Sequence, residues 1–250
     1  MWANLDRMPV IVLLRHGLSS ANTAGILAGR TPGVSLTEDG TRALEATLRM
    51  LPHTSFARLI HSPLLRCVQT AEIAQTHIEV TETRIGEEFV ELDYGDWTGR
   101  SLADLVTTPD WETVSRRASA MRFPAGEAIA EAADRAVSGV RFLVGELREL
   151  ERLEQEAAQR PEPPSESSAA GEKPKPAWGM IVSHGDIIKA IIAEALGMPL
   201  DDFQRLAVAP GSFTIIDYSG PFPVLTAMSV TAAGLAEAGV PGGGGLSDPE

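Results

Sequence analysis

The stretch at residues 10–22 constrains the fold of this chain more than any other. It opens with five consecutive apolar residues, three of them β-branched, at positions 10–14. A short continuous run of this kind is typical of a strand buried on both faces of a sheet. The run ends at Arg15–Gly17, which places a cation and an imidazole after the strand. Open α/β sheets bind their ligands at the carboxyl ends of strands, although a lone Arg-His-Gly triplet is equally compatible with an ordinary surface turn.

Two later apolar stretches end in the same way. Residues 56–60 are expected to form a strand followed by His61–Pro63, with Arg66 early in the next helix. Residues 180–182 are expected to form a short buried strand that ends at Ser183–Gly185. The carboxyl ends of parallel strands share one edge of a sheet, so the polar residues that follow the three strands are expected to converge there.

These residue types indicate phosphoryl transfer through a phosphohistidine. A neutral imidazole attacks phosphorus, while arginines neutralise the phosphate oxygens through paired hydrogen bonds. A carboxylic acid then gives a proton to the leaving oxygen. The loop at 89–99 offers three carboxylates for this step, and the residues alone leave the choice open between Glu91, Asp93 and Asp96. His184 and Asp186 have a spacing that a metal could use, but the nearby arginines would repel a cation.

Predicted helices alternate with the predicted strands. Thr37 is expected to cap a helix that ends before Pro52. Ser62 is expected to cap the next helix, which runs to about Thr76. Further strands are predicted at 78–83, near a sheet edge, and at 213–218 and 224–230. Helical pieces are predicted at 101–121. A long amphipathic helix is predicted to start at 124–127, and a very apolar one to span 187–196. This alternation permits an α/β sandwich.

The chain is expected to form one domain over residues 1–235. About residues 154–176, the composition changes to Glu, Pro, Ser, Ala and Lys without apolar periodicity, which predicts a disordered connector inside the domain. Residues 236–250 include four consecutive glycines and are expected to form a disordered tail. A length of 250 residues with 44% hydrophobic residues is ordinary for a globular protein.

Charge and cysteine content narrow the possible partners and the compartment. The formal net charge of −13 argues against a general binder of nucleic acid or of anionic membranes. It does not exclude an anionic substrate, because a few arginines can dominate the field inside a cleft. Cys67 is the only cysteine, so no disulfide can form within the chain. With no apolar run long enough to span a bilayer, we expect a soluble cytoplasmic protein.

Five motifs in the sequence resemble those of the histidine phosphatase superfamily, the phosphoglycerate-mutase-like proteins. The first is Arg15–Gly17 with Asn22 five residues later. The other four follow in the family's order and are the stretches at 35–40, 62–71, 91–99 and 182–185. The resemblance covers roughly residues 9–230. It implies a three-layer α/β/α sandwich with a mostly parallel central sheet. One departure is Leu18, where many members carry glutamate.

The resemblance also implies roles for individual residues. His16 matches the nucleophile that becomes phosphorylated, and Glu91 matches the proton donor. The phosphate pocket is matched by Arg15, Arg66 and His184, and Asn22 matches a further phosphate contact. His184 is thus expected in the catalytic group as well as in the phosphate pocket. The family uses no metal, and we expect no cofactor.

The expected function is metal-independent hydrolysis of a small phosphomonoester through a phosphohistidine at His16. One alternative is a mutase that moves a phosphoryl group within a phosphoglycerate, which would need a closed pocket and a grip on the substrate carboxylate. Another is a protein that binds a phospholigand without catalysis, for which Glu91 would not be needed. The sequence leaves open the substrate and the oligomeric state, including a homodimer. It also leaves open whether a cluster of arginines contacts substrate, namely Arg100, Arg116, Arg117 and Arg122.

Overall fold

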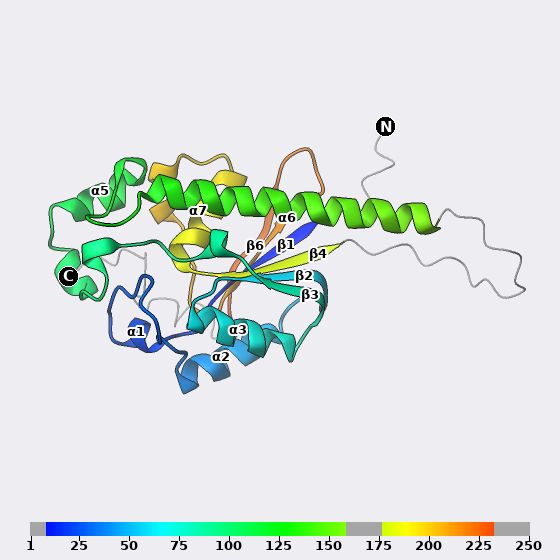
Figure 1. Cartoon of the computed structure of the whole chain (residues 1–250), viewed down its shortest axis with the longest axis horizontal. Coiled ribbons are helices and arrows are strands. Elements are labelled where there is room, and N and C mark those ends of the chain that lie inside the picture. Colours follow the sequence, from blue (N-terminus) through cyan, green and yellow to red (C-terminus); the bar gives the residue numbers. More distant parts are fainter. Residues whose placement is uncertain (1–8, 159–176, 233–250) are drawn as a thin grey trace, which may run out of the picture.

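The computed structural model describes residues 9–158 and 177–232, and these form a six-stranded sheet between two layers of helices (Figure 1). The strands lie in the order β3-β2-β4-β1-β5-β6. The pairings β3-β2, β2-β4 and β4-β1 are parallel, while β5 runs antiparallel to both of its neighbours. The strands are β1 Val10–Arg15, β2 Ser55–His61, β3 Glu79–Ile85, β4 Trp178–Ser183, β5 Phe213–Asp217 and β6 Val224–Val230. The predicted three-layer fold with a mostly parallel sheet is confirmed.

Strand β1 is buried on both faces, as its continuous apolar run predicts. Ile11 and Leu13 belong to one hydrophobic cluster, and Val12 and Leu14 belong to the other. Successive side chains of a strand point to opposite faces, so a central strand of a three-layer fold needs apolar residues at every position. The burial of all six residues of β1 therefore follows from its place in the middle of the sheet.

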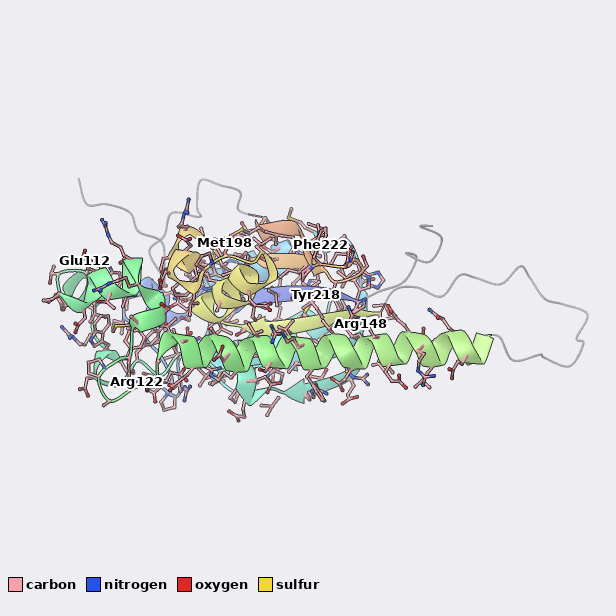
Figure 2. All side chains as sticks on the ribbon, turned by 90° about the horizontal axis from the view of Figure 1, so that it is seen from above. Glu112, Arg122, Arg148, Met198, Tyr218 and Phe222 are labelled. Atoms are coloured by element: carbon pink, nitrogen blue, oxygen red, sulfur yellow. The ribbon has the colours of Figure 1, made fainter. Side chains whose placement is uncertain are left out.

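A layer of helices packs against each face of the sheet (Figure 1). Helices α2 (Glu38–Leu48) and α3 (Leu65–Gln75) cover one face. Helices α6 (Ile129–Ala158) and α7 (Gly185–Ala195) cover the other. Figure 2 shows α6 running along one side of the molecule, where Arg148 donates a hydrogen bond to the main-chain oxygen of Tyr218 (3.4 Å). The predicted edge position of β3 and the final pair of strands are also present.

The shorter elements agree in part with the sequence. Thr37 caps α2 by accepting a hydrogen bond from the main-chain nitrogen of Gly40 (2.9 Å), as predicted. The expected cap of α3 is wrong, because that helix begins at Leu65 and the hydroxyl of Ser62 contacts His184 instead. The predicted helical pieces are present, and the short helices are α1 Ser20–Thr23, α4 Leu102–Leu105 and α5 Asp110–Arg116, with 3-10 turns at Glu87–Phe89, Gly95–Trp97, Ala118–Ala120 and Leu200–Arg205.

The predicted start of the connector is too early, because α6 continues through residues 154–158. Glu, Gln and Ala are good helix formers, so this polar segment extends the helix without an apolar stripe. Arg152 also pairs with Glu149 and Glu156 on neighbouring turns. Residues 159–176 and the predicted tail at 236–250 lie outside the described residues. Within the described residues, no helix is long and apolar enough to cross a membrane.

The packing of α6 generates a prediction about stability. Leu143 is fully buried in the cluster between α6 and the sheet, whereas Leu153 on the same helix keeps 48% of its surface exposed. Leu143→Ala is expected to lower the free energy of unfolding by about 2–5 kcal/mol, because it removes buried methyl groups and leaves a cavity. Leu153→Ala, the matched control, is expected to change it by less than about 0.5 kcal/mol. Urea denaturation measures both, and similar losses would contradict the placement of Leu143 in the core.

Candidate active site

Two histidines lie side by side where β1 and β4 end. The register of this parallel pair sets Arg15 opposite Ser183, so the next residue of each strand, His16 or His184, enters the same space. The main-chain nitrogen of His16 donates to the oxygen of Ser183 (3.0 Å). The centroids of the two imidazole rings are 5.3 Å apart. Both side chains are buried, so the site lies within the sheet edge rather than on the surface.

Two arginines complete the cationic part of the site. Arg66, in the first turn of α3, places one guanidinium nitrogen 2.9 Å from the oxygen of Gly29 and 3.1 Å from Nδ1 of His184. Arg15 donates to the main-chain oxygen of Val208, and its guanidinium packs against Gly185 at the start of α7. Both arginines are almost fully buried. Guanidinium groups match the charge and geometry of phosphate oxygens, so this pair is chemically suited to an anion.

His16 is held as a neutral imidazole with one free lone pair. Its Nδ1 lies 2.8 Å from the oxygen of Gly17. A carbonyl oxygen only accepts hydrogen bonds, so Nδ1 carries the proton and Nε2 keeps its lone pair. Burial, followed by the charges of Arg66 and Arg15, holds the pKa of His16 well below its usual value. The ring is therefore neutral, and nucleophilic at Nε2, at neutral pH.

Glu91 is the carboxyl group that joins this cluster. Its Oε2 is 3.7 Å from Nδ1 of His184, and its Oε1 accepts a hydrogen bond from the main-chain nitrogen of Leu92 (3.0 Å). Burial, followed by the negative charge of Asp186, raises the pKa of Glu91 to about 7, against the opposing effect of Arg66. A substantial fraction of Glu91 therefore carries a proton at neutral pH.

The two rival acids lie elsewhere in the same loop. Asp93 accepts a hydrogen bond from the main-chain nitrogen of Gly95 (3.0 Å), which ties its carboxylate to the turn. Asp96 is exposed. Of the three carboxylates that the sequence left open, Glu91 is the one that the fold places beside the paired histidines.

His184 is also neutral, which changes how its contact with Glu91 is understood. Burial, followed by the charge of Arg66, holds the pKa of His184 well below its usual value. Its Nδ1 accepts from Arg66, and its Nε2 donates to the hydroxyl of Ser62 (2.8 Å). The 3.7 Å approach of Glu91 is therefore not an ion pair. In this structure, the ring of His184 links Arg66 to Ser62.

Asn22 stands apart from these contacts. It lies in α1, where its Oδ1 accepts hydrogen bonds from the main-chain nitrogen (3.1 Å) and the hydroxyl (2.8 Å) of Ser19. Ser19 in turn caps the helix, so the pair forms a capping box. The carbonyl end of the Asn22 amide is thus committed to the helix start, which leaves the NH₂ end as the part chemically suited to a phosphate oxygen.

Three residues near Glu91 were not predicted as a group. The hydroxyl of Tyr94 donates to Oδ2 of Asp186 (2.9 Å), and Nζ of Lys189 lies 3.6 Å from Oδ1 of Asp186. Lys189 is fully buried, although it stands in an otherwise apolar helix. That lone cation among isoleucines and alanines was the available sequence signal. Lys189 and Asp186 form a largely buried ion pair, and the negative charge of Asp186 acts on Glu91.

The arginines considered as a possible substrate grip lie on the surface. All four are exposed, and Arg122 forms an ion pair with Glu131. Figure 2 shows Arg122 at the same end of the molecule as Glu112 of α5. In the described ranges, 9–158 and 177–232, no group of three histidine, cysteine or acidic side chains is arranged to hold a metal ion. The four arginines are Arg100, Arg116, Arg117 and Arg122.

The three-layer fold and the paired histidines and arginines define a phosphoglycerate-mutase-like protein. The family model of the histidine phosphatase superfamily (branch 1) matches residues 11–157 and 155–231, and the chain belongs to this superfamily. The match spans most of the chain, as the sequence motifs predicted. The recognition of the family from its motifs is therefore confirmed.

Proteins similar in sequence include phosphatases and a phosphoglycerate mutase. The chain is 25% identical over 225 residues to the adenosylcobalamin/alpha-ribazole phosphatase of Salmonella typhimurium, which covers 88% of this chain and 96% of that protein. It is 25% identical over 224 residues to the acid phosphatase of Mycobacterium tuberculosis, covering 88% and 92%. It is 27% identical over 229 residues to the 2,3-bisphosphoglycerate-dependent phosphoglycerate mutase of Thermoplasma acidophilum, covering 90% and 95%. These relatives support an enzyme with phosphatase or mutase activity.

Solved structures show the same fold. A mycobacterial glucosyl-3-phosphoglycerate phosphatase superposes with a TM-score of 0.65 at 23% identity, covering 88% of this chain and 98% of that one. The alpha-ribazole phosphatase of Shigella flexneri superposes with a TM-score of 0.63 at 24% identity, covering 88% and 96%. The fold is thus shared over nearly the full length of both structures.

The surroundings of Cys67 generate a prediction about thiol reactivity. Its Sγ is buried, 3.7 Å from the oxygen of Ser183 and 3.5 Å from Nε2 of His184. Burial raises the pKa of the Cys67 thiol to about 12. At about pH 8, the native protein is expected to resist an aromatic disulfide reagent that labels the denatured chain quickly, because the thiolate is the reactive form. Fast labelling of the native protein would contradict this burial.

Proposed function

We propose that this enzyme hydrolyses small phosphomonoesters in two steps through a phosphohistidine at His16. The observation that carries the proposal is the meeting of a histidine with a free Nε2 and a carboxyl group in one buried site. Nδ1 of His16 is bound to the oxygen of Gly17, and Glu91 lies 3.7 Å from the second histidine, with a pKa raised to about 7 that leaves a substantial fraction protonated. This pairing supplies both a nucleophile and an acid at neutral pH. Arg15 and Arg66 supply the positive charge for the phosphate.

In the first step, Nε2 of His16 attacks phosphorus, and the bond from phosphorus to the ester oxygen breaks. Glu91 gives its proton to the departing oxygen, so the alcohol leaves neutral. Arg15 and Arg66 hold the phosphate oxygens, with Asn22 as a further donor. His184 contributes to the phosphate pocket and keeps Arg66 in place through its Nδ1. The step calls for no metal or cofactor in this proposal.

In the second step, water attacks the phosphohistidine. Glu91, now ionised, takes a proton from that water, and the bond between phosphorus and Nε2 breaks. His16 returns to its neutral form and inorganic phosphate leaves. The single cysteine fits a reducing compartment, and a cytoplasmic location is part of the proposal. The relatives carry different substrate names, so the proposal covers the phosphomonoester class.

Hydrolysis is favoured over mutase chemistry by the arginines outside the site. A mutase must hold a substrate carboxylate and exclude water while the phosphoryl group moves. The four arginines that could have provided the grip are exposed, and Arg122 is already paired with Glu131. Asp186 also adds a second carboxylate beside Glu91, which disfavours a carboxylate on the substrate.

Trapping the intermediate tests the nucleophile. Rapid acid-free quenching of the enzyme with labelled substrate is expected to give a phosphoenzyme that is stable to base and labile to acid. His16→Ala is expected to abolish both turnover and the trapped label, because both ring nitrogens of the paired His184 are engaged by Arg66 and Ser62. A phosphoenzyme of normal yield in His16→Ala would contradict the assignment of His16 as the nucleophile. If the label moves to a phosphoglycerate faster than to water, the enzyme acts as a mutase and the proposed phosphatase function is wrong.

The pH dependence of the same step tests the acid. Phosphorylation needs protonated Glu91, so its single-turnover rate with an alkyl phosphate should fall about tenfold per pH unit above a pKa of about 7. No loss is expected from His16 on moving from pH 7 to pH 6, because its pKa lies well below its usual value. Glu91→Gln should remove the alkaline limb and slow alkyl phosphates about 100- to 10,000-fold, but activated aryl phosphates much less. Equal slowing of both substrates would show that Glu91 only shapes the site.

A further inference from the structure

The loop that carries Glu91 is locked to a turn that comes just before α6. The main-chain nitrogen of Asp96 donates to the oxygen of Pro124 (2.9 Å), and that of Glu127 donates to the oxygen of Asp93 (3.0 Å). The backbones approach so closely that a Cβ atom at Gly95 would lie 2.0 Å from the oxygen of Pro124, a distance no side chain tolerates. The turn and the acid loop therefore act as one unit of structure.

A single carboxylate oxygen lies at the centre of this unit. Oε1 of Glu127 accepts from a guanidinium nitrogen of Arg30 (3.0 Å) and from one of Arg135 (2.9 Å). It also accepts from the main-chain nitrogen of Asp93 (2.9 Å), two residues after the acid. The side chain of Glu127 keeps only 17% of its surface exposed, and those of Arg135 and Arg30 keep 22% and 38%. Hydrogen bonds between charged groups are the stronger kind.

Both arginines also hold the main chain of Glu91 itself. Nε of Arg30 donates to the oxygen of Glu91 (2.9 Å), and a guanidinium nitrogen of Arg135 lies 3.3 Å from the same oxygen. Arg135 further donates to the oxygen of Glu88 (2.7 Å). Glu127 thus holds Arg30 and Arg135 in place, and both arginines bind the main-chain oxygen of Glu91. Arg30 precedes Glu91 in the sequence and Arg135 follows it.

The carboxyl group of Glu91 follows its backbone closely. Its Oε1 is bound by the adjacent nitrogen of Leu92, so the side chain has little freedom to correct a shift of the loop. Its Oε2 already lies 3.7 Å from His184. Proton transfer needs a separation of about 2.6–3.2 Å, and a displacement of about 1 Å can cost about 100-fold in rate.

We propose that Glu127 is a positioning residue for this reaction: through Arg30 and Arg135, it fixes the loop that presents Glu91 to the leaving oxygen of the substrate. The inference rests on the proposed role of Glu91 as the acid. Glu127 itself touches no residue of the histidine pair. Its effect is therefore confined to substrates whose leaving group needs a proton.

The test compares two substrate classes in single-turnover phosphorylation. Glu127→Ala is expected to slow an alkyl phosphate about 10- to 100-fold, while an activated aryl phosphate is little affected. In the Glu91→Gln background, where the acid is already lost, Glu127→Ala is expected to add no further slowing of the alkyl phosphate. Equal slowing of both classes by Glu127→Ala, or additive losses in the double variant, would overturn the proposal.

A second ion pair on α6 gives the matched control. Glu146 binds Arg84 through two hydrogen bonds of 2.9 and 2.7 Å, and this pair is also partly buried but lies away from the acid loop. Glu146→Ala is expected to show no selectivity between the substrate classes. Thermal unfolding is measured for every variant. Should Glu127→Ala fail to fold, Glu127→Gln replaces it, because it keeps the side-chain volume. This variant is expected to lose less of the phosphorylation rate, with the same selectivity for the alkyl phosphate. Absence of that selectivity would also overturn the proposal.

The Glu91→Gln variant distinguishes failure of the proposed function from failure of the positioning role of Glu127. If Glu91→Gln slows both substrate classes equally, the acid is assigned wrongly and the proposed function needs revision. If Glu91→Gln is selective and Glu127→Ala is not, the proposed function stands and only the positioning role is lost. If both are selective and their effects do not add, both proposals hold.

Discussion

The parallel pairing of β1 with β4 is the constraint on which the rest of the structure depends. Six consecutive residue pairs, from Val10 with Trp178 to Arg15 with Ser183, bring together two segments that are far apart in the sequence. A slip of one residue would turn every side chain to the opposite face of the sheet. Both strands are buried on both faces, so such a slip would disrupt the packing of the core. It would also move the two histidines out of their shared position.

Burial of two guanidinium groups beside those histidines has an electrostatic cost that the surrounding groups offset only in part, since burial still lowers the pKa of Arg15. Arg66 is bound by the oxygen of Gly29, and Arg15 by that of Val208. The carboxyl groups of Glu91 and Asp186 lie near enough to favour the charge on Arg15. Both imidazoles respond by staying neutral, since burial and the arginines disfavour a further positive charge. Burial and the charges of the two arginines therefore keep the proposed nucleophile unprotonated.

Much of this arrangement could be predicted from the sequence, because its signals are local. An apolar run followed by Arg15 and His16 indicates a buried strand with polar residues at its end, and the same logic located His184. The connections around Glu91 could not be predicted. Arg30 and Glu127 are 97 residues apart, and no periodicity or motif links them. The extension of α6 through residues 154–158 was missed because the prediction relied on apolar spacing, whereas helix propensity and pairs of charges sustain that end.

The edge strand β3 has a consequence for how the molecule behaves at high concentration. Among the residues that the structure describes, no strand pairs with its outer side, a feature that invites another chain to add on. The strand carries Glu79, Glu82 and Arg84, and the two glutamates are exposed. Bringing two such edges together would set like charges against each other and strip them of water. The charges on β3 therefore protect this border of the sheet against polymerisation.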